Sequence, residues 1–212
     1  RKTTSLNPDF AEAHSNLGLT LQILDRLEES EISYRRAIAL KPDFVQAHYN
    51  LGITLNKLGR SEEAEASYTR AISLKPNFTE AHYNSGNMLR ELNRLQEAEA
   101  SYTKAIELKP DYIEAYYNLG ITHQAMDKFD EAEASFRQVV ALKPDYAEAH
   151  GNLGVSLKEL GRLNEAQTSL RQAIAFQPNI AEIHYNLGVT LQDLGKLEEA
   201  EASYRQAIVL KP

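Results

Sequence analysis

Asparagine recurs at a fixed spacing along this sequence. Six asparagines lie 34 residues apart, namely Asn16, Asn50, Asn84, Asn118, Asn152 and Asn186. An amide side chain both donates and accepts hydrogen bonds, as the backbone of an extended peptide requires. Asparagine is a poor helix former, so its recurrence within a predicted helix favours a binding role. We predict a row of amides that binds a peptide main chain, with hydrogen bonding between adjacent helices as the alternative.

Tyrosine precedes the asparagine in four of these six places, while serine and glycine take the other two. The tyrosines are Tyr49, Tyr83, Tyr117 and Tyr185, and the exceptions are Ser15 and Gly151. Tyrosine is enriched in protein interfaces because it combines a large apolar ring with a polar hydroxyl. The tyrosines are therefore candidates for the same peptide-binding surface, and packing of their rings on the next helix is the alternative.

Histidine lies two residues before the asparagine in five copies, which raises the question of a metal site. These residues are His14, His48, His82, His150 and His184. One histidine per repeat places neighbours about 20 Å apart, or two helix spacings. Ligands must lie about 2 Å from one ion, so no two of these histidines can share it. We predict that they pack between helices and that the chain holds no metal.

Other chemistry finds no support in the sequence. There is no cysteine, which excludes thiolate ligands, cysteine nucleophiles and disulfides. No glycine-rich phosphate loop and no Ser-His-Asp or paired-carboxylate arrangement stands out. We predict no catalytic residue, no cofactor and no enzymatic activity.

The element that positions these residues is a 34-residue unit, best seen in residues 43–76. All seven prolines share its spacing, from Pro8 to Pro212. The repeats are 9–42, 43–76, 77–110, 111–144, 145–178 and 179–212. A fixed period in this range is typical of a repeat array. We predict one array spanning residues 1–212, with residues 1–8 as the end of an upstream repeat and the chain as an excerpt of a longer array.

Each unit is predicted to contain two helices. The first begins after the proline with an N-terminal capping box, formed by Asp9/Glu12, Asp43/Gln46, Asn77/Glu80, Asp111/Glu114, Asp145/Glu148 and Asn179/Glu182. A residue that tolerates a left-handed backbone separates the two helices, namely Asp25, Gly59, Asn93, Asp127, Gly161 and Gly195. The second helix runs to the next Leu-Lys-Pro or its equivalent, where proline ends it.

The helices carry apolar stripes that one pair cannot bury alone. In the second copy His48, Leu51, Gly52 and Leu55 share one face. Stacked pairs bury these stripes in a continuous core, so we predict an all-α, open superhelical solenoid of helix-turn-helix units. The asparagine lies about 200° around the helix from the packing stripe, so we expect it to face an inner groove.

These positions resemble the tetratricopeptide repeat (TPR). The family has a large residue, Leu-Gly, another large residue, Ala, an aromatic, Ala and Pro at set places. The second copy matches it with His48, Leu51, Gly52, Leu55, Ala64, Tyr68, Ala71 and Pro76. The asparagine row is similar to the superhelical TPR region of O-GlcNAc transferase, which implies binding of a peptide. The carboxylate-binding Lys and Arg of chaperone-binding TPR domains are absent from the matching positions.

Composition limits the partners. The chain has 30 acidic and 23 basic residues and a formal net charge of −7, which argues against nucleic acid because binding its backbone needs a basic face. No apolar run reaches the length of a membrane span. Acidic pairs such as Glu62 and Glu63 are expected on a solvated outer face. The lack of cysteine fits a reducing compartment such as the cytoplasm.

Three functions are compatible with the sequence. The first is a non-catalytic scaffold that binds an extended peptide or partner segment in the groove through the asparagine row. The second is the substrate-recruiting region of an enzyme similar to O-GlcNAc transferase. The third is an architectural array that self-associates end to end through apolar surface at its ends.

Overall fold

The computed structural model describes residues 10–211, and within that range the chain is all α-helix without strands. The first helices of the pairs are α2 (Ala11–Ile23), α4 (Val45–Lys57), α6 (Thr79–Glu91), α8 (Ile113–Ala125), α10 (Ala147–Glu159) and α12 (Ala181–Asp193). The second helices are α3 (Leu27–Leu40), α5 (Ser61–Leu74), α7 (Leu95–Leu108), α9 (Phe129–Leu142), α11 (Leu163–Phe176) and α13 (Leu197–Leu210). The predicted all-α class and the two helices per unit are confirmed.

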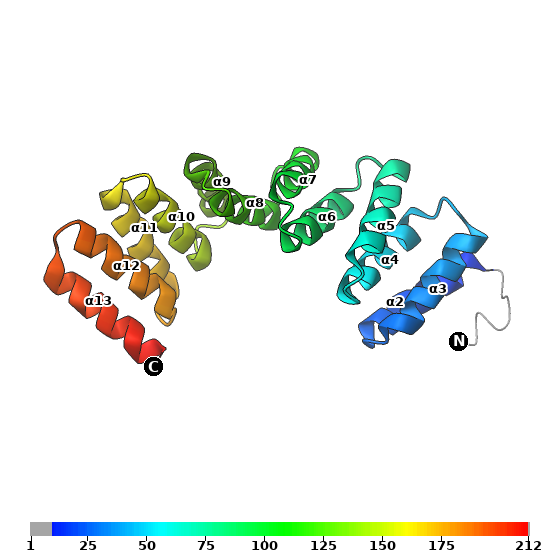
Figure 1. The fold of residues 1–212 in the computed structure, drawn as a ribbon, viewed down its shortest axis with the longest axis horizontal. Coiled ribbons are helices and arrows are strands. Elements are labelled where there is room, and N and C mark those ends of the chain that lie inside the picture. Colours follow the sequence, from blue (N-terminus) through cyan, green and yellow to red (C-terminus); the bar gives the residue numbers. More distant parts are fainter. Residues whose placement is uncertain (1–9, 212) are drawn as a thin grey trace. The chain divides into compact units, whose positions relative to one another are not determined.

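The helices form two compact units, Arg1–Lys109 and Pro110–Pro212. Within each unit the two helices of a pair lie antiparallel and side by side (Figure 1). The second helix also packs on the first helix of the next pair, as α3 does on α4 and α11 on α12. Consecutive first helices touch as well, so that α8, α10 and α12 form a row. The predicted upstream repeat end at residues 1–8, Asp9 and Pro212 lie outside the described residues.

The close approach within each pair depends on the glycine of the Leu-Gly position. A Cβ added at Gly52 would lie 2.8 Å from the ring of Tyr68, closer than real Cβ contacts. The ring of Tyr68 is buried, and the same arrangement recurs between Gly120 of α8 and Phe136 of α9. Glycine on the first helix therefore makes room for the bulky residue of the second.

The residue between the two helices of each pair has a left-handed backbone. The φ angle is +74° at Gly59 and +57° at Asn93. Non-glycine residues rarely adopt this region, and Asn and Asp are the ones that tolerate it best. The predicted helix C-caps are confirmed at all six positions, Asp25, Gly59, Asn93, Asp127, Gly161 and Gly195.

The predicted capping boxes are wrong. Lys41 to Phe44 form a tight turn, in which the Phe44 N–H donates to the Lys41 carbonyl at 3.0 Å. The helix therefore begins at Val45, one residue beyond an aromatic N-cap, and no side chain caps it. The other pairs fail in the same way, because none of the described first helices has a side-chain cap at Asn77/Glu80, Asp111/Glu114, Asp145/Glu148 or Asn179/Glu182.

Each unit has its own buried core. Tyr34, Leu55 and Tyr102 are fully buried in the first unit, where apolar stripes of adjacent pairs meet. In the second unit Phe136 packs with Leu153 and Leu157, and Leu170 packs with Leu187 and Leu191. Within residues 10–211, no helix has both the length and the apolar character needed to cross a bilayer.

Candidate functional site

Two of the predicted asparagines connect the first helices of successive repeats. The Asn84 Nδ2 donates to the Tyr49 Oη at 2.6 Å, and the Asn152 Nδ2 donates to the Tyr117 Oη at 3.0 Å. The Oδ1 atoms of Asn84 and Asn152 have no partner among residues 10–211, and neither oxygen is fully buried. In each amide the nitrogen thus donates a structural hydrogen bond, while the oxygen stays available to accept one from a peptide N–H.

The other asparagines differ because the residue that lies 35 positions earlier differs. Ser15 stands where Asn50 would need a tyrosine, and the Asn50 Oδ1 instead accepts from Gln46 Nε2 at 3.0 Å. Gly151 stands before Asn186, whose amide has no hydrogen-bond partner within residues 10–211. Asn16 is exposed and Asn118 is half-buried. The row is therefore chemically uneven, although its members occupy equivalent positions on the helices.

The tyrosines pack against aromatic residues at the start of the next repeat. The ring of Tyr49 lies 4.7 Å from that of Phe78, and Tyr117 stacks on Tyr146 at 5.2 Å. Burial raises the pKa of Tyr49 and of Tyr117 above the usual phenol value. The ring-packing alternative accounts for these two residues, since both ring and hydroxyl are held in place.

All four tyrosines also contact an aromatic residue on the second helix of their own pair. The ring of Tyr83 lies 6.0 Å from that of Tyr102, as the ring of Tyr49 lies 6.3 Å from that of Tyr68. Tyr185 is 55% exposed on the last first helix, and its ring lies 5.9 Å from that of Tyr204. Tyr185 is thus the predicted tyrosine most available to a partner.

A pocket of about 350 Å³ opens on the row of first helices α8, α10 and α12. It brings together three predicted site residues of the second unit, Tyr117, Asn152 and Asn186. Its other polar lining residues are Gln124, Glu148 and Glu182, and its apolar lining comes from Gly151, Val155, Ile180 and Ile183. Asn16, Asn50, Asn84, Asn118, Tyr49, Tyr83 and Tyr185 do not line it.

Sequence reasoning missed the contribution of Glu148 and Glu182 to this pocket. It assigned both to capping boxes, which the structure does not contain. The signal that could have revealed the pocket is the break in the repeat pattern at two positions. Gly151 replaces the tyrosine, and Ile183 replaces an alanine found in the other five copies.

Four of the five histidines hydrogen-bond to the turn that precedes their helix. The Nε2 atom of His48 lies 3.0 Å from the Pro42 carbonyl oxygen, six residues earlier. His82, His150 and His184 contact Pro76, Pro144 and Pro178 in the same way. A carbonyl oxygen can only accept, so the ring nitrogen donates and ties the turn to the first helix. Among the described residues, no group of His, Asp and Glu is placed to hold a metal ion.

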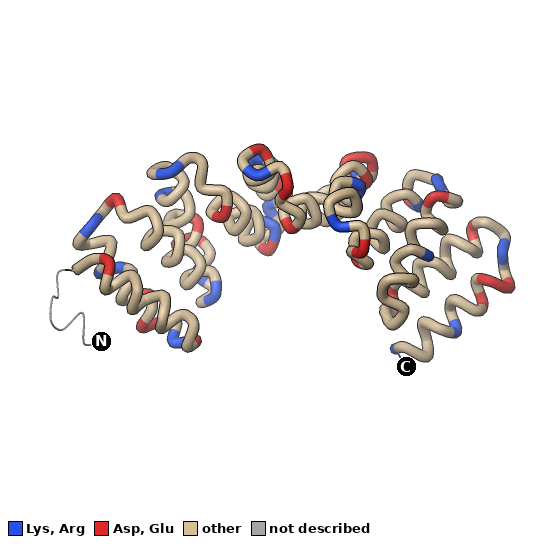
Figure 2. The backbone as a smooth tube through the Cα atoms, turned by 180° about the vertical axis from the view of Figure 1, so that it is seen from behind, with Lys and Arg blue, Asp and Glu red and all other residues tan. Residues whose placement is uncertain are grey.

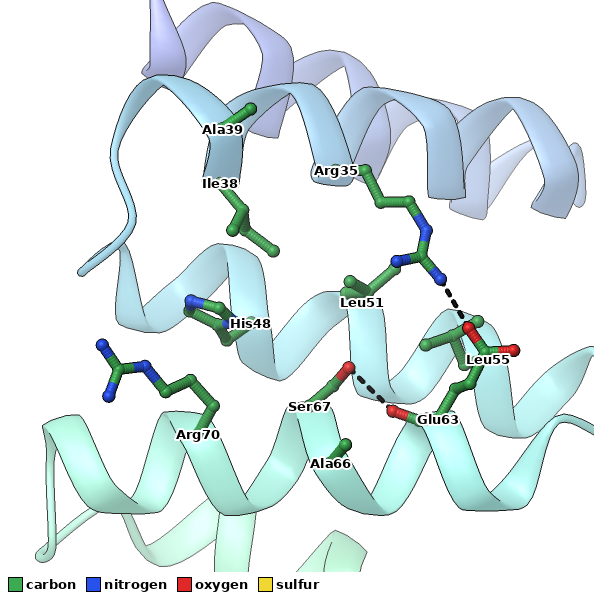
Figure 3. A pocket seen from close by; sticks show the side chains of 10 residues that line it. All are labelled: Arg35, Ile38, Ala39, His48, Leu51, Leu55, Glu63, Ala66, Ser67 and Arg70. Carbon is green, nitrogen blue, oxygen red and sulfur yellow. Dashed lines mark hydrogen bonds and ion pairs between the residues drawn. The ribbon is translucent and has the colours of Figure 1, made fainter.

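A second cavity, of about 420 Å³, lies between α3 and α5 over the core face of α4 (Figure 3). His48, Leu51 and Leu55 line it from α4, and an ion pair between Arg35 and Glu63, at 2.7 Å, joins α3 to α5 at one side of it. Equivalent ion pairs join Arg137 to Glu165 and Arg171 to Glu199. The cavity is therefore part of a contact that repeats along the array, and it does not single out a ligand.

Ion pairs also connect the second helices of successive repeats. The Arg60 guanidinium lies 2.7 Å from Glu31 of the preceding repeat and 2.6 Å from Glu63 of its own helix. Arg162 joins Glu133 and Glu165 in the same pattern. Basic and acidic segments are interspersed along each unit (Figure 2). Much of the acidic character of the second helices is thus locally neutralised.

Solved structures with the same repeat architecture include several TPR proteins. YrrB, described as "a TPR protein with an unusual peptide-binding site", matches with a TM-score of 0.76 and 24% identity over 84% of this chain and 92% of that one. PilF of Pseudomonas aeruginosa matches with a TM-score of 0.77 and 19% identity over 95% of this chain and 92% of that one. MamA of Desulfovibrio magneticus RS-1 matches with a TM-score of 0.75 and 22% identity over 79% of this chain and 94% of that one. None of these matches is an O-GlcNAc transferase, and at these identities they show a shared fold.

Sequence comparison agrees with the structural one. No curated protein matches the chain significantly. The family profile described as "TPR repeat" matches residues 23–59, 86–127 and 156–195. The profile described as "Tetratricopeptide repeat" matches residues 45–78, 113–146 and 181–212. The chain therefore belongs to the TPR repeat family, whose members generally take part in protein–protein interactions.

Proposed function

We propose that this chain is a non-catalytic scaffold that binds an extended peptide along its row of first helices. The observation that carries the proposal is the pocket over α8, α10 and α12, in which Tyr117, Asn152 and Asn186 converge. Asn84 and Asn152 are held by tyrosine hydroxyls and keep free acceptor oxygens. Amides fixed before binding lose little entropy when a peptide binds, which favours affinity.

The peptide main chain is the part of a partner that such amides recognise. Free amide oxygens such as those of Asn84 in the first unit and Asn152 in the second suit backbone N–H groups, which every residue except proline carries. The scaffold is thus expected to tolerate many sequences, and the residues between the amides supply selectivity. The partner we propose is a protein segment in extended conformation, and neither nucleic acid nor a membrane is part of the proposal.

The test is a peptide-array screen of the purified chain beside a variant with Asn50, Asn84, Asn118 and Asn152 all replaced by alanine. We expect the wild type to bind extended segments broadly and the variant to lose that binding. Because Asn84 and Asn152 also make structural hydrogen bonds, we expect the variant to keep its helix content with a modestly lower Tm.

A matched control separates binding from stability. The variant Tyr49→Phe/Tyr117→Phe removes the two hydroxyls that hold Asn84 and Asn152 but leaves all amides in place. It should show a similar loss of stability and retain most of the peptide binding. Equal binding by wild type and the four-asparagine variant, with both folded, would overturn the proposal and leave the amides with a structural role alone.

An alternative is that the peptide bound here is the substrate of an attached glycosyltransferase similar to O-GlcNAc transferase. Its support is the similarity of the asparagine positions to the TPR region of that enzyme. Reading the gene beyond Pro212 for a nucleotide-sugar-binding domain distinguishes it from a free-standing scaffold.

Self-association is the remaining candidate, and it is favoured by exposed apolar side chains on α13. Leu197, Ile208 and Val209 are 61%, 65% and 72% exposed. Light scattering over a range of concentrations tests it, since a mass that rises with concentration and persists in the four-asparagine variant is expected for an architectural array.

A further inference from the structure

The pocket over α8, α10 and α12 lies where one tyrosine of the repeat pattern is replaced by glycine. In the preceding copy the ring of Tyr117 packs at the start of the next repeat, whereas Gly151 has no side chain to place there. Ile183 fills part of the space, because a Cβ at Gly151 would lie 3.4 Å from its side chain. About 350 Å³ remains open between the helices.

The pocket is acidic at two points. Glu148 and Glu182 are exposed, line the pocket from neighbouring helices and make no ion pair within residues 10–211. This contrasts with Glu133 and Glu165 of the second helices, which are paired with arginine. No lysine or arginine lines the pocket. Lys143 shares an adjoining pocket with Glu148, and Lys211 shares another with Glu182, but neither lysine lines this one. The charged lining of the pocket is therefore acidic only, which favours a cation.

The electrostatics of Tyr117 agree with this geometry. Burial is the largest cause of its raised pKa, and the charges of Tyr146, Glu148 and Glu182 add to the increase. The hydrogen bond from Asn152 acts in the opposite direction. The fields of both carboxylates thus reach one hydroxyl at the wall of the pocket.

We propose that this pocket binds the side chain of one arginine in the bound peptide. The aliphatic part of arginine would lie against Val155, Ile180 and Ile183, and its planar guanidinium would reach both carboxylates. Lysine carries its charge at one point and cannot form the same two-sided contact. This inference rests on the proposed function, because it assigns a selective position to the same row of first helices.

The first experiment uses arginine alone as the probe. N-acetyl-arginine amide is titrated into the ¹⁵N-labelled chain, and the backbone N–H signal of Gly151 is followed by NMR. We expect a saturable shift at Gly151, with N-acetyl-lysine amide weaker and neutral N-acetyl-citrulline amide without effect. Equal responses to arginine and citrulline, or a response spread over all exposed acidic residues, would overturn the proposal.

Two variants locate the effect. Glu148→Gln/Glu182→Gln removes both charges and should weaken arginine binding by about tenfold, the scale of a charge-assisted hydrogen bond. The control Glu131→Gln/Glu198→Gln makes the same change of charge on exposed, unpaired second-helix residues and should leave binding unchanged.

The second variant closes the pocket without changing the charges. Gly151→Tyr/Ile183→Ala restores the pair of residues that Tyr49 and Ala81 represent in an earlier copy. We expect it to stay folded and to lose the arginine response. A response that survives in this variant would place arginine elsewhere and reject the pocket.

Peptide binding separates this inference from the function on which it rests. Array peptides that bind without any preference for arginine, together with no shift at Gly151, would reject the arginine pocket alone. A shift at Gly151 without binding of any array peptide would support the pocket and reject the extended-peptide scaffold.

Discussion

At the residue scale, the helical glycines of this array differ in how much space their neighbours leave for a side chain. Gly52 lies against the ring of Tyr68, with no room for a methyl group. Gly151 meets only Ile183, at an ordinary van der Waals distance. Both lie inside helices, where glycine is unfavourable, so only the first has a packing reason to be there.

The two glycines should therefore respond differently to alanine. We expect Gly151→Ala to stabilise the chain by up to about 1 kcal/mol, the difference in helix propensity. Gly52→Ala should destabilise it by about 1–3 kcal/mol, because the added Cβ would overlap the Tyr68 ring. Urea unfolding followed by circular dichroism measures both. A stabilising Gly52→Ala would contradict the packing described for α4 and α5.

The sequence predicted which residues recur, but not what they contact. The asparagine and histidine positions follow from the 34-residue spacing, and the structural role of His48 followed from the distance between repeats. The pairing of Asn84 with Tyr49 depends on how closely α4 and α6 approach, which no local pattern contains. The binding role of the asparagine row stays a prediction.

At the scale of the element, helix ends were only half predictable. The C-cap at Gly59 follows from one residue's tolerance of positive φ, and this is a local property. The N-cap of α4 was predicted one residue too early, at Asp43 instead of Phe44, because Lys41 to Phe44 form a turn before the helix begins. Asp and a Glu or Gln three residues later resemble a capping box, yet in this repeat an aromatic residue occupies the N-cap.

Substitutions at the two ends of α4 test this difference. We expect Asp43→Ala to change the free energy of unfolding by less than about 0.5 kcal/mol, as for other exposed sites. Gly59→Ala should cost about 1–2 kcal/mol, because alanine must adopt a left-handed backbone there. Thermal unfolding of the two variants provides the comparison. A loss of about 1 kcal/mol of stability in Asp43→Ala would instead indicate that Asp43 caps the helix.

The N-cap arginine of α7, Arg94, should make stability depend on pH. A hydrogen bond from Arg94 holds the pKa of Glu97 below the usual value of 4.5. Arg94 also contacts Glu65 of the preceding repeat. A lowered folded-state pKa contributes stability that is present above the unfolded pKa and is lost as the pH falls through the folded one.

We therefore expect Arg94→Gln to lower stability at pH 7, with the difference from wild type disappearing as acid protonates Glu97. Urea unfolding between pH 7 and pH 3 measures this difference. Arg70→Gln is the matched control, because Arg70 makes no ion pair within residues 10–211. A difference that is constant with pH would mean that Arg94 acts through packing.

At the scale of the whole molecule, the repeat period determined most of the fold that was predicted. The helix pairs, their order and their glycine contacts follow from a pattern that is present six times. The division into units next to Pro110 could not be anticipated, because the sequence repeats without interruption there. The superhelical arrangement of all six repeats stays a prediction.

The two compact units lead to a prediction about fragments. Residues 110–212 contain three helix pairs and a buried core around Phe136, Leu157 and Leu191. We expect this fragment, expressed alone, to show a helical circular dichroism spectrum and a cooperative thermal transition, as stacked repeats do. A disordered spectrum would mean that its core is insufficient without residues 1–109.

The ion pairs across repeats have a consequence for how such a chain can change in length. Arg60 contacts Glu31, which lies 29 residues earlier, and Arg94 contacts Glu65 at the same separation. Removing residues 43–76 would place Arg94 where Arg60 stands, opposite Glu31, with Gly86 and Tyr102 replacing Gly52 and Tyr68. These ion-pair and glycine contacts would need no compensating substitution at the new junction. Gene duplication or deletion in steps of one repeat could thus lengthen or shorten the protein while these contacts between neighbours are kept.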